Sequence, residues 1–203
     1  MRLPAGWRLP APTPEGLDLL PAADSLGPLA WSPVTAPGFS LPGPDGTTST
    51  LEDFAGKPVI LNFFLGAGCA YCRRQMDLIT PELPRFQGAG IAIRGVTTDT
   101  IELLRAVLSA HERDAPGAPP LYAFPVLSDA QGSVFKSFGA FEEFEGRPLH
   151  GTILVDGSGR ILWRDAGHEP FNHPIQLLRE AERLLQIHTP QGGPSPTSQP
   201  SEP

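Results

Sequence analysis

Hydrophobic residues in the middle of the chain switch between short continuous runs and helical spacing. Residues 58–64 form a nearly continuous apolar run of strand length, which suits a strand buried on both faces. From about Tyr71, apolar side chains recur at helical spacing as far as Phe86. Two prolines interrupt this stretch and predict a kink or a restart of the helix after Thr80.

Strands and helices continue to alternate further along the chain. The pattern predicts strands at 91–96 and 124–127 and helices at 99–108 and 134–138. The first of these helices is expected to begin at Asp99, because Glu102 follows three residues later in a capping pattern.

The last part of the globular region combines a hairpin with a helix. Strand-like runs at 152–155 and 160–163 flank the turn sequence at 156–159, which is a strong signal for an antiparallel hairpin. Pro174 opens a final helix whose apolar stripe ends at Leu185. The alternation predicts an α/β fold with a mostly parallel central sheet flanked by helices. The hairpin is expected to add one antiparallel strand at the edge of this sheet.

Proline sets the expected limits of this domain. The 203 residues include 25 prolines, of which ten lie in residues 1–44 and five in residues 189–203. The last fifteen residues contain no aliphatic or aromatic side chain and cannot bury a core. We therefore predict a Pro-rich N-terminal arm at 1–34, a globular domain at 35–188 and a disordered tail at 189–203.

Charge and hydropathy exclude several classes of protein. The formal net charge is −7 and no basic patch is visible, so we expect no nucleic-acid partner. No apolar run is long enough for a membrane helix, and the first residues lack the apolar core of a signal peptide. Only two cysteines are present, which excludes a disulfide-rich secreted scaffold. The sequence therefore predicts a cytoplasmic protein with no membrane contact.

The two cysteines, Cys69 and Cys72, are separated by two residues at the junction of the buried strand and the following helix. Two thiols in the first turn of a helix lie within reach of a disulfide. The helix N-terminus also stabilises a thiolate, the reactive form of cysteine. Arg73 and Arg74 add positive charge directly after the pair. This arrangement predicts redox chemistry.

Two other interpretations of the cysteine pair stay open. A single C-x-x-C can be half of a zinc site, with histidines completing the ligand set, and only His168 and His173 have the spacing of a histidine pair. The thiols could also be inert and buried. A C-x-x-C within a βαβ pattern favours the redox interpretation, so we expect neither a metal nor a cofactor.

Several spaced motifs resemble those of one family. The chain resembles the thioredoxin-fold redoxins, and within them the AhpC/TSA (peroxiredoxin-like) family, over most of residues 36–187. The resemblance implies a thioredoxin-like fold with a mixed central sheet. The matching segments are Ala36-Pro37-Gly38-Phe39-Ser40-Leu41, Leu51-Glu52-Asp53-Phe54-Ala55-Gly56-Lys57-Pro58, Ser128-Asp129-Ala130-Gln131-Gly132 and Gly151-Thr152-Ile153-Leu154-Val155-Asp156.

The active-site motifs of this family transfer only in part. In peroxiredoxins a proline and a threonine precede the peroxidatic cysteine in one motif. The cysteine of that motif falls on Cys72, whereas its threonine and proline fall on Cys69 and Leu65. His150 stands where a peroxiredoxin has arginine and where a thioredoxin has cis-proline. The resemblance implies supporting roles for His150, Arg73 and Asn62 around a catalytic pair, Cys69 and Cys72, which forms the redox-active disulfide.

The resemblance implies an antioxidant thiol oxidoreductase that reduces peroxides, with a thioredoxin-type or low-molecular-weight thiol as reductant. In this mechanism Cys72 attacks the peroxide and Cys69 condenses with its sulfenic acid. The first alternative is thioredoxin-like exchange with disulfides of protein substrates, in which Cys69 attacks and Cys72 resolves. The second alternative is a non-catalytic zinc-binding or interaction module on a redoxin scaffold. The oligomeric state stays open.

Overall fold

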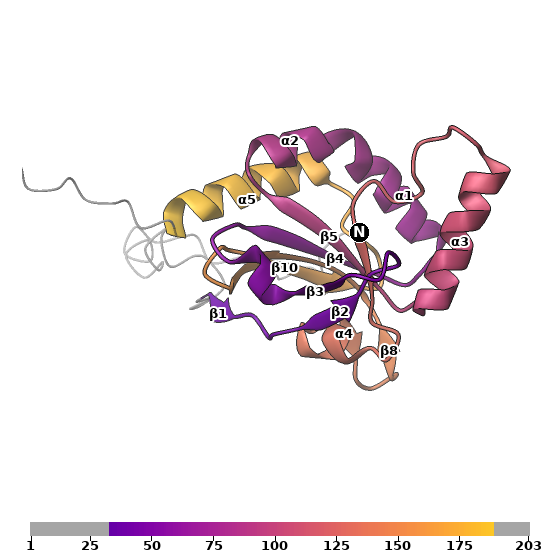
Figure 1. Cartoon of the computed structure of the whole chain (residues 1–203). Helices are drawn as coiled ribbons and strands as arrows, with labels where there is room; N and C mark the ends of the chain where they lie inside the picture. The colour runs from indigo at the N-terminus through magenta and orange to yellow at the C-terminus, as the bar shows by residue number, and fades with distance from the viewer. Residues whose placement is uncertain (1–32, 189–203) are drawn as a thin grey trace, which may run out of the picture. The chain divides into compact units, whose positions relative to one another are not determined.

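A six-stranded sheet forms the centre of the computed structural model, which describes residues 33–188. Its strands lie in the order β1-β10-β9-β4-β5-β6 (Figure 1). Their bounds are β1 Val34–Thr35, β4 Val59–Phe64, β5 Ala92–Thr97, β6 Val126–Ser128, β9 His150–Val155 and β10 Arg160–Gly167. Two small antiparallel pairs accompany the sheet, namely β2 (Ser40–Pro42) with β3 (Thr48–Thr50) and β7 (Phe141–Glu142) with β8 (Arg147–Pro148).

The hairpin of β9 and β10 does not lie where the sequence predicts it. Strands β4, β5 and β6 pair in parallel as expected, but β9 pairs antiparallel with β4 in the interior of the sheet. The prediction that the hairpin supplies an antiparallel strand at the edge of the sheet is therefore wrong, because β9 lies in the interior and β1 forms the edge beside β10. Every residue of β9 is buried, so this strand needs a neighbour on both sides, and β4 and β10 provide them. The mixed sheet and its flanking helices confirm the thioredoxin-like fold.

Helices cover both faces of the sheet. Figure 1 shows α1, α2 and α5 on one side, with α4 and the β2–β3 pair on the other. The bounds are α1 Ala70–Ile79, α2 Leu83–Gly88, α3 Ile101–Asp114, α4 Ser133–Ser137 and α5 Pro174–His188, with 3₁₀ turns at Leu51–Phe54 and Thr80–Glu82. Alternate residues of β4 supply the two cores: Ile60 and Phe64 pack under α1 and α5, and Leu61 packs toward α4. Burying each such side chain contributes about 1.5–3 kcal/mol.

The interruption predicted after Thr80 is confirmed. The chain passes from α1 through the 3₁₀ turn Thr80–Glu82 into α2, with Pro81 and Pro84 each in the first positions of a new turn. Proline has no N–H group to donate to the preceding turn, and it fits only where a helix begins.

The start of α3 differs from the prediction by one residue. The N-cap is Thr100, whose hydroxyl accepts a hydrogen bond from the Leu103 amide at 3.2 Å. The carboxylate of Asp99 instead accepts the amide of Ala67 at 2.9 Å, in the loop before α1. A tertiary contact has therefore drawn Asp99 away from the capping position that its sequence pattern suggests.

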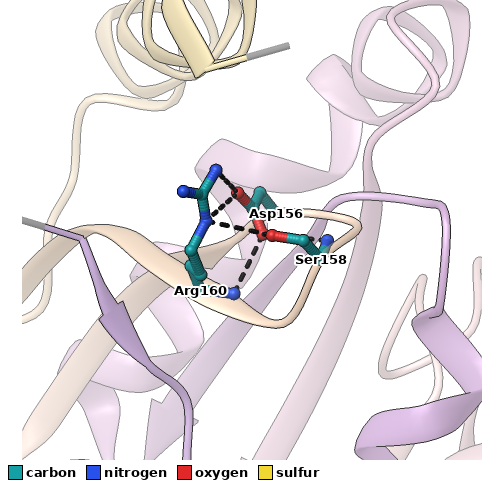
Figure 2. A network of polar contacts seen from close by, with 3 residues as sticks. All are labelled: Asp156, Ser158 and Arg160. Carbon is teal, nitrogen blue, oxygen red and sulfur yellow. Dashed lines mark hydrogen bonds and ion pairs between the residues drawn. The ribbon is translucent and has the colours of Figure 1, made fainter. Parts of the chain in front are cut away.

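A polar network closes the turn between β9 and β10, as Figure 2 shows. One carboxylate oxygen of Asp156 accepts the amides of Ser158 and Arg160, both at 2.9 Å. The other oxygen accepts the Arg160 guanidinium at 2.9 Å. Burial alone would raise the pKa of Asp156, but these hydrogen bonds hold it below its ordinary value. The turn thus fixes the register of the hairpin that carries His150.

The predicted arm at 1–34 lies outside the described residues, apart from its last two, and the predicted tail at 189–203 lies outside them entirely. Val34 begins β1 and pairs with Ile161 of β10. Between residues 33 and 188, no helix is both long enough and apolar enough to cross a bilayer.

Candidate active site

The loop between β4 and α1 is held in place by the segment that follows β5. Gly66 adopts a φ of 105°, a region that favours glycine, and a Cβ at this position would collide with the Asp99 carboxylate. That carboxylate binds the Ala67 amide, and the Thr98 hydroxyl donates to the Leu65 carbonyl at 3.2 Å. These contacts direct the chain so that Cys69 occupies the N-cap position of α1.

The two thiols differ in exposure and in partners. Cys69 is partly exposed at the N-cap of α1, and its Sγ accepts the Cys72 amide at 3.2 Å. Cys72 is 2% exposed, and its Sγ accepts the Leu65 amide at 3.3 Å. Both cysteines are free thiols in this structure. The backbone therefore offers each sulfur one N–H donor, which favours a negatively charged sulfur.

His150 lies against both thiols. Its Nε2 is 3.2 Å from the Cys72 Sγ and 3.5 Å from the Cys69 Sγ, and the side chain is only 3% exposed. Its Nδ1 lies 2.8 Å from the carbonyl oxygen of His168, an acceptor, so Nδ1 carries the ring proton. In the neutral ring, Nε2 is then the acceptor that faces the sulfurs.

Burial controls the charge of these groups. It raises the pKa of Cys72 to about 12, and a hydrogen bond with Cys69 adds to the rise, whereas the Leu65 amide opposes it. Burial also lowers the pKa of His150, against the opposing effect of its bond to the His168 carbonyl. At neutral pH, Cys72 therefore keeps its proton and His150 stays uncharged.

A small pocket opens beside the pair. Its volume is about 50 Å³, and its walls include both cysteines, Arg73 and Tyr122. Burial, followed by the charge of Asp99, raises the pKa of Tyr122 to about 12, so its hydroxyl remains a hydrogen-bond donor at neutral pH. Arg73 thus lies at the site as the sequence suggests, whereas Arg74 is not among the residues that line this pocket.

Asn62 lies in a polar network behind the thiols. Its amide nitrogen donates to Gln75 at 3.1 Å, and its oxygen accepts the Thr152 hydroxyl at 3.3 Å. Gln75 also donates to the Phe171 carbonyl at 3.1 Å. The network joins β4, α1, β9 and the segment before α5. Asn62 therefore fixes the position of α1 and has no hydrogen bond to either sulfur among those identified.

The structure brings together three of the predicted site residues, Cys69, Cys72 and His150, and places Arg73 at the pocket. Sequence reasoning missed Gln75 and Tyr122. Gln75 could have been found, since it is a polar residue on the otherwise apolar stripe of α1, one position before Met76. Tyr122 carried no such signal, because it lies in an irregular loop.

The sulfurs of Cys69 and Cys72 and one ring nitrogen of His150 all lie within 4.8 Å of one another. Among the residues at 33–188, this is the only group of three or more histidine, cysteine or acidic side chains that could hold a metal ion. The pair can therefore perform thiol chemistry or bind a thiophilic ion.

Comparison with known proteins places the chain in a family. Residues 34–164 match the AhpC/TSA family model. A putative peroxiredoxin of Mycobacterium tuberculosis is 32% identical over 151 residues, covering 71% of this chain and 90% of that protein. Peroxiredoxin Bcp of Escherichia coli is 30% identical and covers 62% of this chain and 79% of that protein. The thiol-disulfide oxidoreductase ResA of Bacillus thuringiensis is 25% identical, with coverage of 71% and 75%.

Solved structures share the fold. Peroxidoxin BcpB from Mycobacterium tuberculosis superimposes with a TM-score of 0.60 at 23% identity, over 78% of this chain and 97% of that one. The reduced 2-Cys peroxiredoxin of Plasmodium vivax gives a TM-score of 0.65 at 18% identity, over 78% and 98%. From the matching model, the relatives and the thiol pair at the start of α1, we conclude that the chain belongs to the AhpC/TSA family of thioredoxin-fold oxidoreductases.

Proposed function

We propose that the protein reduces peroxides through a dithiol–disulfide cycle of Cys69 and Cys72. The observation that carries this proposal is the single acceptor nitrogen of His150, which lies within 3.5 Å of both free thiols. The peroxiredoxin relatives support the same reaction, and the match to the family model, residues 34–164, includes the cysteine pair. The chain is thus a peroxiredoxin-like thiol oxidoreductase.

Cys69 is the attacking residue in this proposal, which reverses the order expected from the family motif, where the peroxidatic position falls on Cys72. It is the more exposed thiol, and the N-terminus of α1 directs the Cys72 amide at its sulfur. Cys72 stays protonated at neutral pH because burial raises its pKa to about 12. The Cys69 thiolate attacks one peroxide oxygen, the O–O bond breaks, and the other oxygen leaves as water or an alcohol after it takes up a proton. Cys69 is then a sulfenic acid.

Cys72 closes the cycle. Its sulfur attacks the Cys69 sulfur, the S–O bond breaks, and the hydroxide leaves as water. The Nε2 atom of His150 accepts the Cys72 thiol proton at 3.2 Å. The same nitrogen lies 3.5 Å from the Cys69 Sγ and can pass this proton to the leaving oxygen. Two external thiol groups, from one dithiol or from two thiol molecules, then reduce the disulfide; they become a disulfide themselves, and Cys69 and Cys72 return to thiols.

The size of the pocket indicates which peroxides fit, and the disulfide chemistry indicates which reductants can complete the cycle. A pocket of about 50 Å³ beside the cysteines has room for hydrogen peroxide or another small hydroperoxide, since a cavity of about 10–15 Å³ by the same measure holds one water. The reductant is a thioredoxin-type protein or a low-molecular-weight thiol. A cytoplasmic location is part of the proposal, because the cycle needs a compartment that keeps thiols reduced.

Stopped-flow oxidation of the reduced protein tests this proposal. We expect wild type to turn over hydrogen peroxide with a dithiol reductant and Cys69→Ser to lose both turnover and the first oxidation step. Cys72→Ser should still react once with peroxide and accumulate a sulfenic acid that dimedone traps. If both variants consume peroxide as fast as wild type, the assignment is wrong. If only Cys69→Ser traps with dimedone, Cys72 is the attacking residue.

Exchange with disulfides of protein substrates is the second candidate. It is favoured by the partly exposed Cys69 beside a buried Cys72, and by Tyr71, which is 62% exposed and could contact a substrate chain next to the pair. The similarity to ResA points the same way. Fast reduction of insulin with little turnover of peroxide would establish exchange as the main activity. Thiols that react in neither assay would instead favour a non-catalytic module.

A further inference from the structure

The two thiols and His150 have the arrangement of a three-ligand metal site. In a tetrahedral zinc site, bond lengths to sulfur and nitrogen place the ligand atoms about 3.5 Å apart for S···N and about 3.8 Å for S···S. The His150 Nε2 is 3.5 Å from the Cys69 Sγ and 3.2 Å from the Cys72 Sγ. The three ligand atoms all lie within 4.8 Å of one another, so small side-chain rotations suffice to surround an ion.

The groups behind these ligands are also those that a metal site needs. A ligating histidine usually donates its other N–H group to a carbonyl, which fixes the ring and leaves a lone pair for the ion. Here the Nδ1 of His150 is 2.8 Å from the His168 carbonyl oxygen. Each sulfur accepts one backbone amide, Cys69 from Cys72 at 3.2 Å and Cys72 from Leu65 at 3.3 Å. All three ligands are therefore oriented before any ion arrives.

Charge and burial favour a divalent ion at this position. The two sulfurs become thiolates when they bind a metal, and a neutral imidazole adds no charge, so Zn²⁺ would leave the site neutral. This matters because Cys72 and His150 are both almost fully buried. Two thiolates and an imidazole favour zinc or another thiophilic ion over magnesium or calcium, which prefer oxygen.

We propose that the reduced protein binds one Zn²⁺ ion through Cys69, Cys72 and His150, with the fourth position open to water. Binding replaces the two thiol protons by two zinc–sulfur bonds and releases both protons. The disulfide uses the same two sulfurs, so zinc and the disulfide exclude each other. This site goes beyond the proposed peroxidase cycle, and its existence does not depend on that activity.

Metal titration of the full chain tests this inference without peroxide. The reduced protein competes with a chromophoric chelator for zinc, and the expected result is one ion bound per chain with release of two protons. Protein oxidised with diamide to the Cys69–Cys72 disulfide should take up none. His150→Gln should weaken binding at least about tenfold. His111→Gln, a change in a histidine on α3 outside the group, should leave it unchanged.

Cobalt provides a readout that needs no variant. Co²⁺ added to the reduced wild-type protein should give the near-ultraviolet charge-transfer absorption of thiolate ligation, and zinc should displace it. Failure of reduced wild type to take up zinc, equal binding by the oxidised form, or unchanged affinity in His150→Gln would each overturn the site. A protein that turns over peroxide but takes up no zinc would overturn this inference alone, whereas one that binds zinc without turning over peroxide would remove only the peroxidase proposal.

Discussion

The Nε2 atom of His150 lies 3.2 Å from the Sγ of Cys72. A hydrogen bond at the other ring nitrogen makes Nε2 an acceptor. This nitrogen, Nδ1, is held 2.8 Å from the His168 carbonyl, which keeps the ring proton away from the sulfurs. A buried thiol with a raised pKa thus has a buried neutral base beside it. The two groups form a pair that can transfer a proton without contact with bulk solvent.

Replacing this base should change the pH dependence of disulfide closure. Because burial lowers the pKa of His150, the ring stays neutral through pH 7 and gains a proton only below its ordinary value of 6.5. After a peroxide pulse, wild-type closure should be constant near neutral pH and slow down in that acidic range. In His150→Gln the closing rate should fall by about 100-fold or more, without the acidic inflection. Acid quenching followed by mass spectrometry of alkylated thiols measures both rates.

The comparison protein for that experiment is His111→Gln, which should follow the wild-type profile. Its side chain lies on α3, where Nε2 is 2.8 Å from the Pro119 carbonyl and has no contact with the thiols. An identical pH profile in His150→Gln and wild type would show that His150 does not take the proton.

The two thiols should differ in alkylation. Iodoacetamide reacts with thiolates, so at pH 7 the partly exposed Cys69 should be modified well before the buried Cys72. In Cys69→Ser, the alkylation rate of Cys72 should keep rising with pH past the ordinary cysteine pKa of 9.0. Peptide mapping at a series of times gives both rates. Equal labelling at neutral pH, or a plateau for Cys72 below pH 9, would contradict the proposed order of attack.

Gly66→Ala should destabilise the loop before α1. The φ of 105° at this residue is unfavourable for alanine, and the added Cβ would collide with the Asp99 carboxylate. We expect the free energy of unfolding to fall by about 1–3 kcal/mol. Gly68→Ala is the matched control, because a Cβ there has no atom within 4 Å. Urea denaturation compares the two, and equal stabilities would mean that Asp99 moves aside without cost.

Asp156→Asn should weaken the hairpin in a pH-dependent way. Hydrogen bonds from Ser158 and Arg160 hold the folded-state pKa of Asp156 below 3.8, so its contribution to stability is complete above that pH and is lost as the pH falls through the folded-state pKa. At pH 7 the variant should lose about 1.5–3 kcal/mol of unfolding free energy. The difference from wild type should shrink below pH 3.8.

Asp114→Asn provides the reference for this loss. Its carboxylate pairs with Arg113 at 3.8 Å on an exposed surface, where ion pairs contribute little. Thermal unfolding across the acidic range should therefore show a pH-dependent deficit for Asp156→Asn only. A deficit that is constant with pH would indicate that the carboxylate charge is not what holds the turn.

Local signals predicted much of this structure. The buried strand, the helix broken at Pro81 and the hairpin at 156–159 each depend on neighbours within a few residues, and all three are confirmed. The position of β9 beside β4 is a long-range choice, made because β9 is buried along its whole length. Asp99 and Thr100 are both good caps, and only the tertiary contact with Ala67 decides between them.

The residues of the candidate site also fall into two groups, those marked by local sequence and those brought together only by the fold. Spacing and position were enough to mark Cys69 and Cys72, whereas His150 lies 78 residues after Cys72 and was indicated by the family resemblance alone. The network of Asn62, Gln75 and Thr152 joins three elements and has no sequence motif of its own. Such contacts become visible only once the sheet and α1 are placed together.

The position of both cysteines at the start of α1 determines which motions disulfide closure requires. The two sulfurs lie within 4.8 Å of one another at the start of α1, so rotation about side-chain bonds can bring them together without separating α1 from the sheet. Side-chain rotations take picoseconds to nanoseconds where the residue is free to move, whereas local unfolding takes microseconds to seconds. The protein can therefore alternate between its redox states with its backbone hydrogen bonds intact, and the speed of the cycle is left to bond chemistry and to the arrival of the reductant.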